Sequence, residues 1–173
     1  GDGPVGTSNG NNRKNPLYQA FIDAGQEAGY GLTDDYNGYR QEGFGPMHMT
    51  VRGGVRSSTS RSYLEPVRNR SNLTVITGAE VDRIELEEGV AKRVVFKKAG
   101  AIKVASTRRE VVLSAGSIGS PSILQRSGIG PANVLSDAGV AMVHELPGVG
   151  EGLTDHCLLY TSDGCRRGIG CCS

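Results

Sequence analysis

Apolar residues recur at a helical spacing early in the chain, at Leu17, Phe21, Ala24 and Ala28. In front of them, Asn15 is suited to cap a helix and Pro16 to begin one, and Gly29 behind them is suited to end it. The pattern therefore predicts a helix from Pro16 to Gly29 with one face buried. A second, shorter helix is predicted over residues 58–67.

Further along the chain, the apolar residues fall into short strand-like segments with short turns between them. These segments are residues 73–77, 80–86, 90–96 and 102–106. Strands joined by short turns run in opposite directions, so this part of the chain predicts an antiparallel meander. Val111, Val112 and Leu113 then form a continuous apolar run, which is typical of a strand buried on both faces.

Two other stretches show no such periodicity. Residues 1–14 consist largely of Gly, Asn and charged side chains and are predicted to form a loop. Residues 31–54 are rich in Gly, Asp, Asn and Tyr. For them we expect an ordered loop of the type that forms the wall of a site.

A turn without bulky side chains follows the apolar run. Ala115 and Gly116 carry at most a methyl group, so a ligand has room to approach the main chain. Ser120 is suited to cap the next helix, Pro121 to begin it and Gly128 to end it. A strand, a small-residue turn and a helix in this order are typical of dinucleotide-binding folds. The same pattern also fits a turn that only packs a strand closely against a helix.

Composition and charge narrow the classes of function. The chain has 37% hydrophobic and 21% charged residues, which is ordinary for a globular protein. Its net charge of +1, with acidic residues balancing the arginine-rich stretch 52–70, predicts no nucleic-acid partner. No stretch reaches the roughly 18 apolar residues of a membrane-spanning helix, so no transmembrane segment is predicted.

Histidines and cysteines do not form a recognisable ligand set. His48, His144 and His156 are far apart in the sequence, and no metal site is predicted. All the cysteines follow His156, and their spacing fits no zinc or haem motif. Residues 157–163 resemble translated sequencing-adapter sequence, so we predict that residues 157–173 are a non-native, disordered tail.

Residues 116–130 resemble, position for position, the second signature of the glucose-methanol-choline (GMC) oxidoreductase family of flavoproteins. Other blocks with the same resemblance are residues 54–64, 70–75, 146–150 and 155–156. Blocks outside the shared signatures resemble the bacterial choline dehydrogenases of this family; they are residues 15–17, 28–30, 33–35, 37–39 and 41–47.

The resemblance implies an α/β fold, a partial FAD-binding domain of the two-dinucleotide-binding, Rossmann-like type with an inserted antiparallel β-meander. Residues 1–156 would be the central part of this domain, with residues 1–54 as a loop-rich lead-in that contains one helix. The chain begins with Gly and not with Met, so we expect an internal piece of a longer protein.

The cofactor that the resemblance implies is FAD. In the family, the main chain at the position of Val81 touches the adenine, and the positions of Ser114, Ala115 and Gly116 line the ADP portion. These four residues are therefore the predicted cofactor-binding residues.

The resemblance also implies a reaction. In this family a histidine in a C-terminal segment deprotonates an alcohol, and hydride passes from the alcohol carbon to the flavin. That histidine lies outside the part that this chain resembles, so no catalytic residue is assigned and the piece alone is expected to be inactive. The parent is expected to be a choline dehydrogenase that makes betaine aldehyde for glycine betaine synthesis and passes electrons to an acceptor other than NAD. The alternatives are another GMC primary-alcohol dehydrogenase and an inactive flavin-fold binding module.

Overall fold

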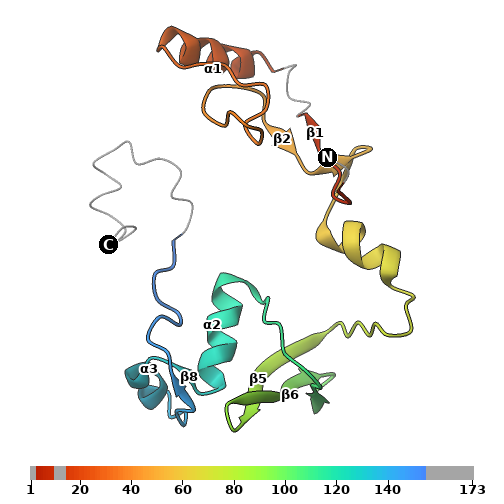
Figure 1. The fold of residues 1–173 in the computed structure, drawn as a ribbon, viewed down its shortest axis with the longest axis vertical. Coiled ribbons are helices and arrows are strands. Elements are labelled where there is room, and N and C mark those ends of the chain that lie inside the picture. The colour runs from red at the N-terminus through yellow and green to blue at the C-terminus, as the bar shows by residue number, and fades with distance from the viewer. Residues whose placement is uncertain (1–2, 10–14, 155–173) are drawn as a thin grey trace. The chain divides into compact units, whose positions relative to one another are not determined.

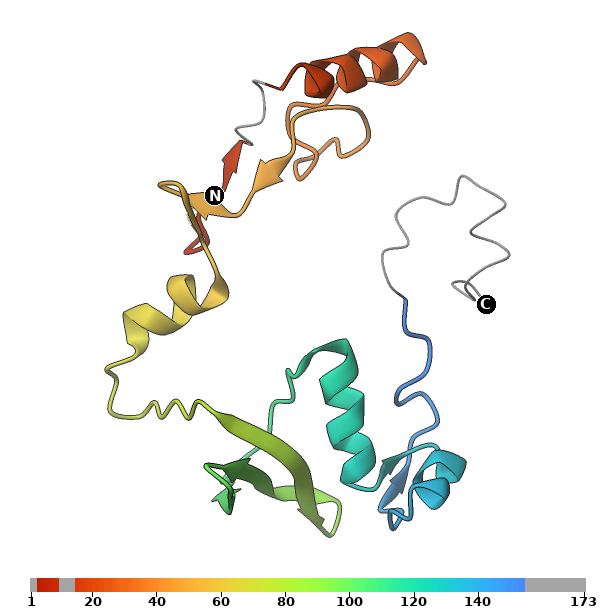
Figure 2. The same ribbon diagram turned by 180° about the vertical axis from the view of Figure 1, so that it is seen from behind.

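The computed structural model describes residues 3–9 and 15–154 and divides the chain into two compact units, Gly1–Val75 and Ile76–Ser173. Figure 1 shows their elements, and Figure 2 shows the same elements from behind. No helix in the described ranges is long and apolar enough to cross a membrane. The predicted tail, residues 157–173, lies outside the described residues, so its non-native origin stays a prediction.

The predicted first helix is confirmed as α1 (Pro16–Glu27). It begins where the cap was expected, because the Asn15 side-chain oxygen accepts a hydrogen bond of 3.0 Å from the Leu17 N–H. Pro16 has no N–H to leave unpaired in the first turn. The helix ends two residues before Gly29.

The expected buried face of α1 is wrong. Leu17 is 75% exposed and Phe21 is 68% exposed. The buried residue of the helix is Gly25, against which the ring of Phe44 lies so closely that an added Cβ would overlap it. Within the described residues, α1 therefore covers one aromatic side chain of the following loop and not an apolar core. The spacing of apolar residues in the sequence is the same in both cases and could not distinguish them.

The rest of the N-terminal unit consists of small antiparallel pairs and turns. β1 (Ser8–Asn9) pairs with β2 (His48–Met49), so the prediction that residues 1–14 are all loop is wrong at the two positions of β1. β3 (Val51–Arg52) and β4 (Val55–Arg56) form a tight hairpin. The predicted helix over 58–67 is present as a π-helical turn, η2 (Ser60–Leu64), and a 3₁₀ turn, η3 (Glu65–Val67).

The predicted meander is confirmed in the C-terminal unit. β5 (Ala79–Glu87), β6 (Val90–Lys98) and β7 (Ala101–Ser106) form an antiparallel sheet in the order β5-β6-β7. Both connections are two-residue turns, Glu88–Gly89 and Ala99–Gly100, with positive φ at each position. Such turns match the twist of antiparallel strands and therefore fix their register.

Two predicted strands are absent from the described residues. Residues 73–77 and Val111–Leu113 have no regular secondary structure and belong to no sheet of the described residues. Val112 is 78% exposed, so the continuous apolar run is not buried on both faces here. A strand requires a neighbour for its main-chain groups, and no described segment lies beside either stretch.

The helix after the small-residue turn begins earlier than predicted. α2 (Gly116–Arg126) includes Ser120 and Pro121, which were expected to cap it and begin it. The Ser120 hydroxyl instead accepts a hydrogen bond of 3.0 Å from the Ala115 N–H and so stabilises the turn before the helix. Pro121 lies inside the helix, where its missing N–H removes one main-chain hydrogen bond. Gly128 ends the helix as predicted, with φ +79°.

A small parallel unit follows α2. β8 (Ile129–Gly130) pairs in parallel with β9 (His144–Glu145), and α3 (Ala132–Asp137) connects them. Leu135 of α3 is 1% exposed. The other buried apolar residues of the C-terminal unit are Ile84, Val95, Phe96, Ile123 and Val149. The core thus lies on both sides of α2, which packs against β5 of the sheet and against β8, where α3 also packs.

Gly128 offers a test of this packing. An added Cβ would lie 2.5 Å from the Ala141 carbonyl oxygen, whereas at Gly139, which also has positive φ, it would meet nothing within 4 Å. We expect Gly128→Ala to lower the free energy of unfolding by roughly 2–4 kcal/mol, since backbone strain and overlap add. Gly139→Ala should cost about 1 kcal/mol, because only the strain applies. Urea unfolding followed by circular dichroism measures both, and equal losses would contradict the packing described.

Candidate functional site

The four predicted cofactor-binding residues all lie in the C-terminal unit. Val81 is in β5, and Ser114, Ala115 and Gly116 form the turn that leads into α2. Among the described residues, no hydrogen bond joins Val81 to this turn. Instead, α2 connects the two groups, because it begins at Gly116 and its last residue contacts the main chain of Val81.

The turn before α2 has the open main chain that the sequence predicts. Gly116 has φ +85°, a conformation that side chains with a Cβ rarely adopt, and no atom lies within 4 Å of an added Cβ. The space on this side of the main chain is therefore free for a ligand. Cofactor binding by these residues stays a prediction at this point.

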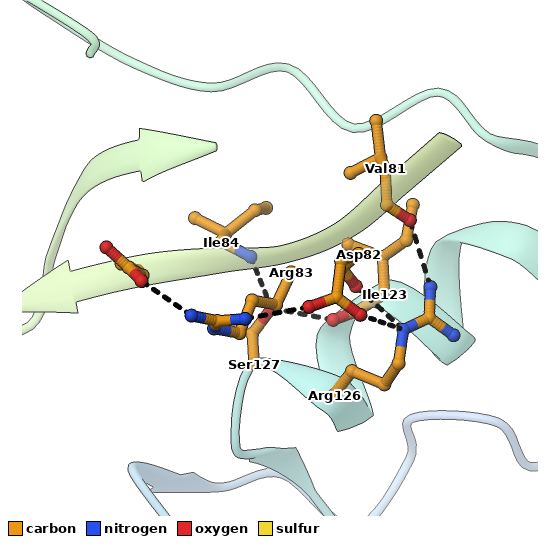
Figure 3. Close-up of polar contacts among 8 residues, drawn as sticks. Val81, Asp82, Arg83, Ile84, Ile123, Arg126 and Ser127 are labelled. Atoms are coloured by element: carbon orange, nitrogen blue, oxygen red, sulfur yellow. Dashed lines mark hydrogen bonds and ion pairs between the residues drawn. The ribbon is translucent and has the colours of Figure 1, made fainter. Parts of the chain in front are cut away.

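Arg126, the last residue of α2, binds two successive carbonyl groups of β5 (Figure 3). Its Nε donates to the Asp82 carbonyl oxygen at 2.7 Å and its Nη2 to the Val81 carbonyl oxygen at 3.2 Å. Its third nitrogen, Nη1, donates to the Ser122 hydroxyl at 2.7 Å, one turn back on the same helix. One guanidinium thus joins the end of α2 to the strand.

Ser127, the next residue, adds a second contact with β5. The buried Ser127 hydroxyl accepts a hydrogen bond of 2.8 Å from the Ile84 N–H and donates one of 2.6 Å to the Ile123 carbonyl (Figure 3). β5 is an edge strand of the sheet, and its pairing with β6 is irregular between Val81 and Arg83. Main-chain groups at a sheet edge or a bulge have no ladder partner, and here side chains at the end of α2 serve as partners.

Charged side chains of the sheet surround this contact. Arg83 lies between Asp82 and Glu85, with both N–O distances 2.8 Å, and Arg93 binds Glu85 and Glu87 at 2.8 and 2.7 Å. The hydrogen bond from Arg93 is the main reason why the pKa of Glu85 is lowered. The pKa of Arg83 is raised, chiefly by its hydrogen bond to Asp82. All these groups are open to solvent, so we expect them to add little to stability.

A cleft of about 570 Å³ runs along one side of α2. Its walls are Ser117, Pro121, Ser122 and Gln125 of the helix and the segment 150–154 that follows. Gln125 fixes this segment, because its side-chain amide donates to the Val149 carbonyl at 3.2 Å. The first turn of α2 and the end of the 146–150 block therefore line the same cleft. In the sequence, these two segments belong to separate blocks of the family resemblance.

Arg126, Ser127 and Gln125 were not among the predicted site residues. All three lie within the 116–130 signature, and an arginine in the last turn of a helix is a common end signal. No sequence pattern gave their partners, because Val81 and Arg126 are 45 positions apart. Position in the signature was the only signal that could have directed attention to them.

The histidines form no metal site in the described part of the chain, where no three His, Cys, Asp or Glu residues gather. In the N-terminal unit, His48 stacks on Tyr36, and its Nδ1 lies 3.4 Å from an Asp35 carboxylate oxygen. His144 lies in β9. His156 is outside the described residues.

Comparison with known proteins gives consistent results. Residues 2–158 match the sequence profile of the family described as GMC oxidoreductase. The chain is 56% identical over 170 residues to the oxygen-dependent choline dehydrogenase of Photobacterium profundum, covering 98% of this chain and 30% of the relative.

Two solved structures resemble the fold. Pyridoxine 4-oxidase from Mesorbium loti matches with a TM-score of 0.78 and 32% identity, over 84% of this chain and 29% of the other. A formate oxidase matches with a TM-score of 0.77 and 28% identity, over 90% and 27%. The chain thus spans about 30% of the length of the relatives that it matches.

Ser127 tests the contact between α2 and β5. We expect Ser127→Ala to lower the free energy of unfolding by roughly 1–3 kcal/mol, because the buried Ile84 N–H loses its acceptor. Ser122→Ala, which removes only an exposed bond to Arg126, should change it by less than about 0.5 kcal/mol. Urea unfolding of the two variants is the measurement. A Ser127→Ala protein as stable as Ser122→Ala would show that the buried bond contributes nothing.

Proposed function

The chain belongs to the GMC oxidoreductase family, and we propose that the protein to which it contributes is an FAD-dependent alcohol oxidoreductase that oxidises choline to betaine aldehyde. The chain itself forms part of an FAD-binding domain. Because it spans only about 30% of its relatives, the reaction, the substrate and the electron acceptor are all parts of this proposal.

The observation that carries the proposal is the identity with choline dehydrogenases over nearly the whole chain. The fold alone does not choose the substrate. Proteins named for pyridoxine and for formate share it at similar TM-scores but at lower identity. Choline is therefore favoured over other primary alcohols by sequence and not by architecture.

The predicted residues fit the adenosine portion of FAD. At Gly116 the main chain faces open space, so a phosphate or ribose can approach without meeting a side chain. The first N–H groups of α2 are directed out of its N-terminal end, and the helix dipole favours negative charge there. Val81 would offer its main chain to the adenine, while Ser114 and Ala115 would line the ADP portion beside Gly116.

These residues bind and orient, and none is assigned a proton transfer. When bound, FAD supplies the chemistry of the reaction by accepting hydride from the alcohol carbon. The small side chains of Ala115 and Gly116 keep the turn open, and the Ser120 hydroxyl holds the Ala115 N–H so that the turn keeps its shape. The role of this part of the chain is thus to hold the cofactor in place for chemistry supplied elsewhere.

The proposal is tested on the protein expressed from its complete gene and loaded with FAD. We expect choline to bleach the visible flavin absorbance without oxygen, at least about tenfold faster than an uncharged aliphatic alcohol of similar size. Oxygen or a dye acceptor is then added. The compound that restores the flavin absorbance is the one that accepts the electrons.

Two results would contradict parts of this proposal. Bleaching by aliphatic alcohols but not by choline would replace choline with another primary alcohol. Turnover of choline by residues 1–173 alone, with FAD and a dye, would show that this chain holds catalytic residues that the proposal places elsewhere.

A further inference from the structure

We propose that Arg126 is a positioning residue for the cofactor, because it fixes the main chain of β5 at Val81. The inference rests on the proposed function, which assigns the Val81 main chain to the adenine of FAD. It adds a residue that does not itself touch the cofactor. Arg126 acts through the two carbonyl groups that it holds.

The need for such a residue arises from the irregular pairing of β5. Val81 is opposite Phe96 and Arg83 is opposite Val95, so Asp82 is an extra residue on β5. A bulge of this kind leaves the extra residue unpaired and disrupts the ladder locally, so the strand is held less firmly by its neighbour at this point. If the main chain of Val81 is to bind the adenine, a contact other than the pairing with β6 must hold it in place.

The geometry of arginine suits this support. A guanidinium is planar, so its Nε and Nη2 donors keep a fixed relation to each other, and both are used on successive carbonyls at 2.7 and 3.2 Å. The bond from Nη1 to Ser122 fixes the guanidinium itself. The Asp82 carboxylate, 3.6 Å from Nε, does so as well (Figure 3). A lysine could reach one carbonyl but could not hold both in one plane.

The helix transmits this support to the second cofactor segment. α2 has 11 residues and is thus about 16 Å long. Its first residue, Gly116, belongs to the predicted ADP-binding turn, and its last, Arg126, holds Val81. The two predicted contacts with FAD are therefore fixed relative to each other through one rigid element. Binding sites depend on such alignment to within about 0.5 Å.

Arg93 provides a matched control. The side chains of Arg93 and Arg126 are equally exposed, at 42%, and both form ion pairs with carboxylates of β5. Among the residues that the structure describes, Arg93 binds only the carboxylates of Glu85 and Glu87 and no main-chain carbonyl. Loss of Arg93 thus removes a comparable surface charge without freeing the strand at Val81.

The experiment uses the full-length protein, from which FAD is removed and then titrated back. We expect Arg126→Ala to weaken FAD binding about tenfold, because part of the binding free energy then goes into ordering β5, while kcat at saturating FAD changes less than about twofold. Arg126→Lys should restore part of the affinity, with a loss of about threefold. Arg93→Ala should bind FAD like the wild type.

Three results would overturn the inference. Wild-type FAD affinity in Arg126→Ala would do so, even if its unfolding temperature fell, because the role would then be structural only. An equal loss in Arg93→Ala would assign the effect to surface charge. If Arg126→Ala cannot be purified, Arg126→Lys decides, and wild-type affinity in that variant contradicts the role of the planar fork. A wild-type protein that binds no FAD would instead refute the proposed function, and the inference with it.

Discussion

The contact between the C-terminal end of α2 and β5 organises the C-terminal unit. Arg126 binds two successive carbonyls of β5, those of Val81 and Asp82, and Ser127 binds the N–H of Ile84, two residues further on. The bond to Ile84 is buried, so leaving its N–H without an acceptor would cost more than the bond itself contributes. The contact also brings Ile123 of the helix and Ile84 of the strand together in the core.

The other features of this unit follow from that contact. With β5 fixed, the two-residue turns place β6 and β7 in register, and Val95 and Phe96 join the core. Gly128 then turns the chain sharply enough for β8 to follow α2 and to pair with β9. The segment 146–154 returns along α2, where Gln125 holds it at the cleft. The family signature at 116–130 thus encodes a helix whose C-terminal end binds both β5 and the segment that follows Leu146.

The sequence predicted the local elements well, because their signals are local. Asn15 before Pro16 identified the start of α1, and the short turns between the apolar segments indicated the hairpins. The predictions failed where the outcome depends on distant partners. The run Val111–Leu113 has the composition of a buried strand, yet no described strand lies beside it. Likewise, Arg126 has no sequence feature that indicates Val81. Family resemblance supplied the cofactor and the candidate residues, which periodicity alone left open between a ligand site and a packing turn.

The central claim is that β5 and the turn before α2 hold one cofactor between them and that Arg126 aligns the two. The structure of the full-length protein with FAD bound tests it most directly. The account predicts the adenine at the main chain of Val81, the ADP portion along Ser114–Gly116, and the Arg126 guanidinium still on the Val81 and Asp82 carbonyls. An adenine bound away from β5, or an Arg126 side chain turned from the strand in the loaded protein, would contradict it.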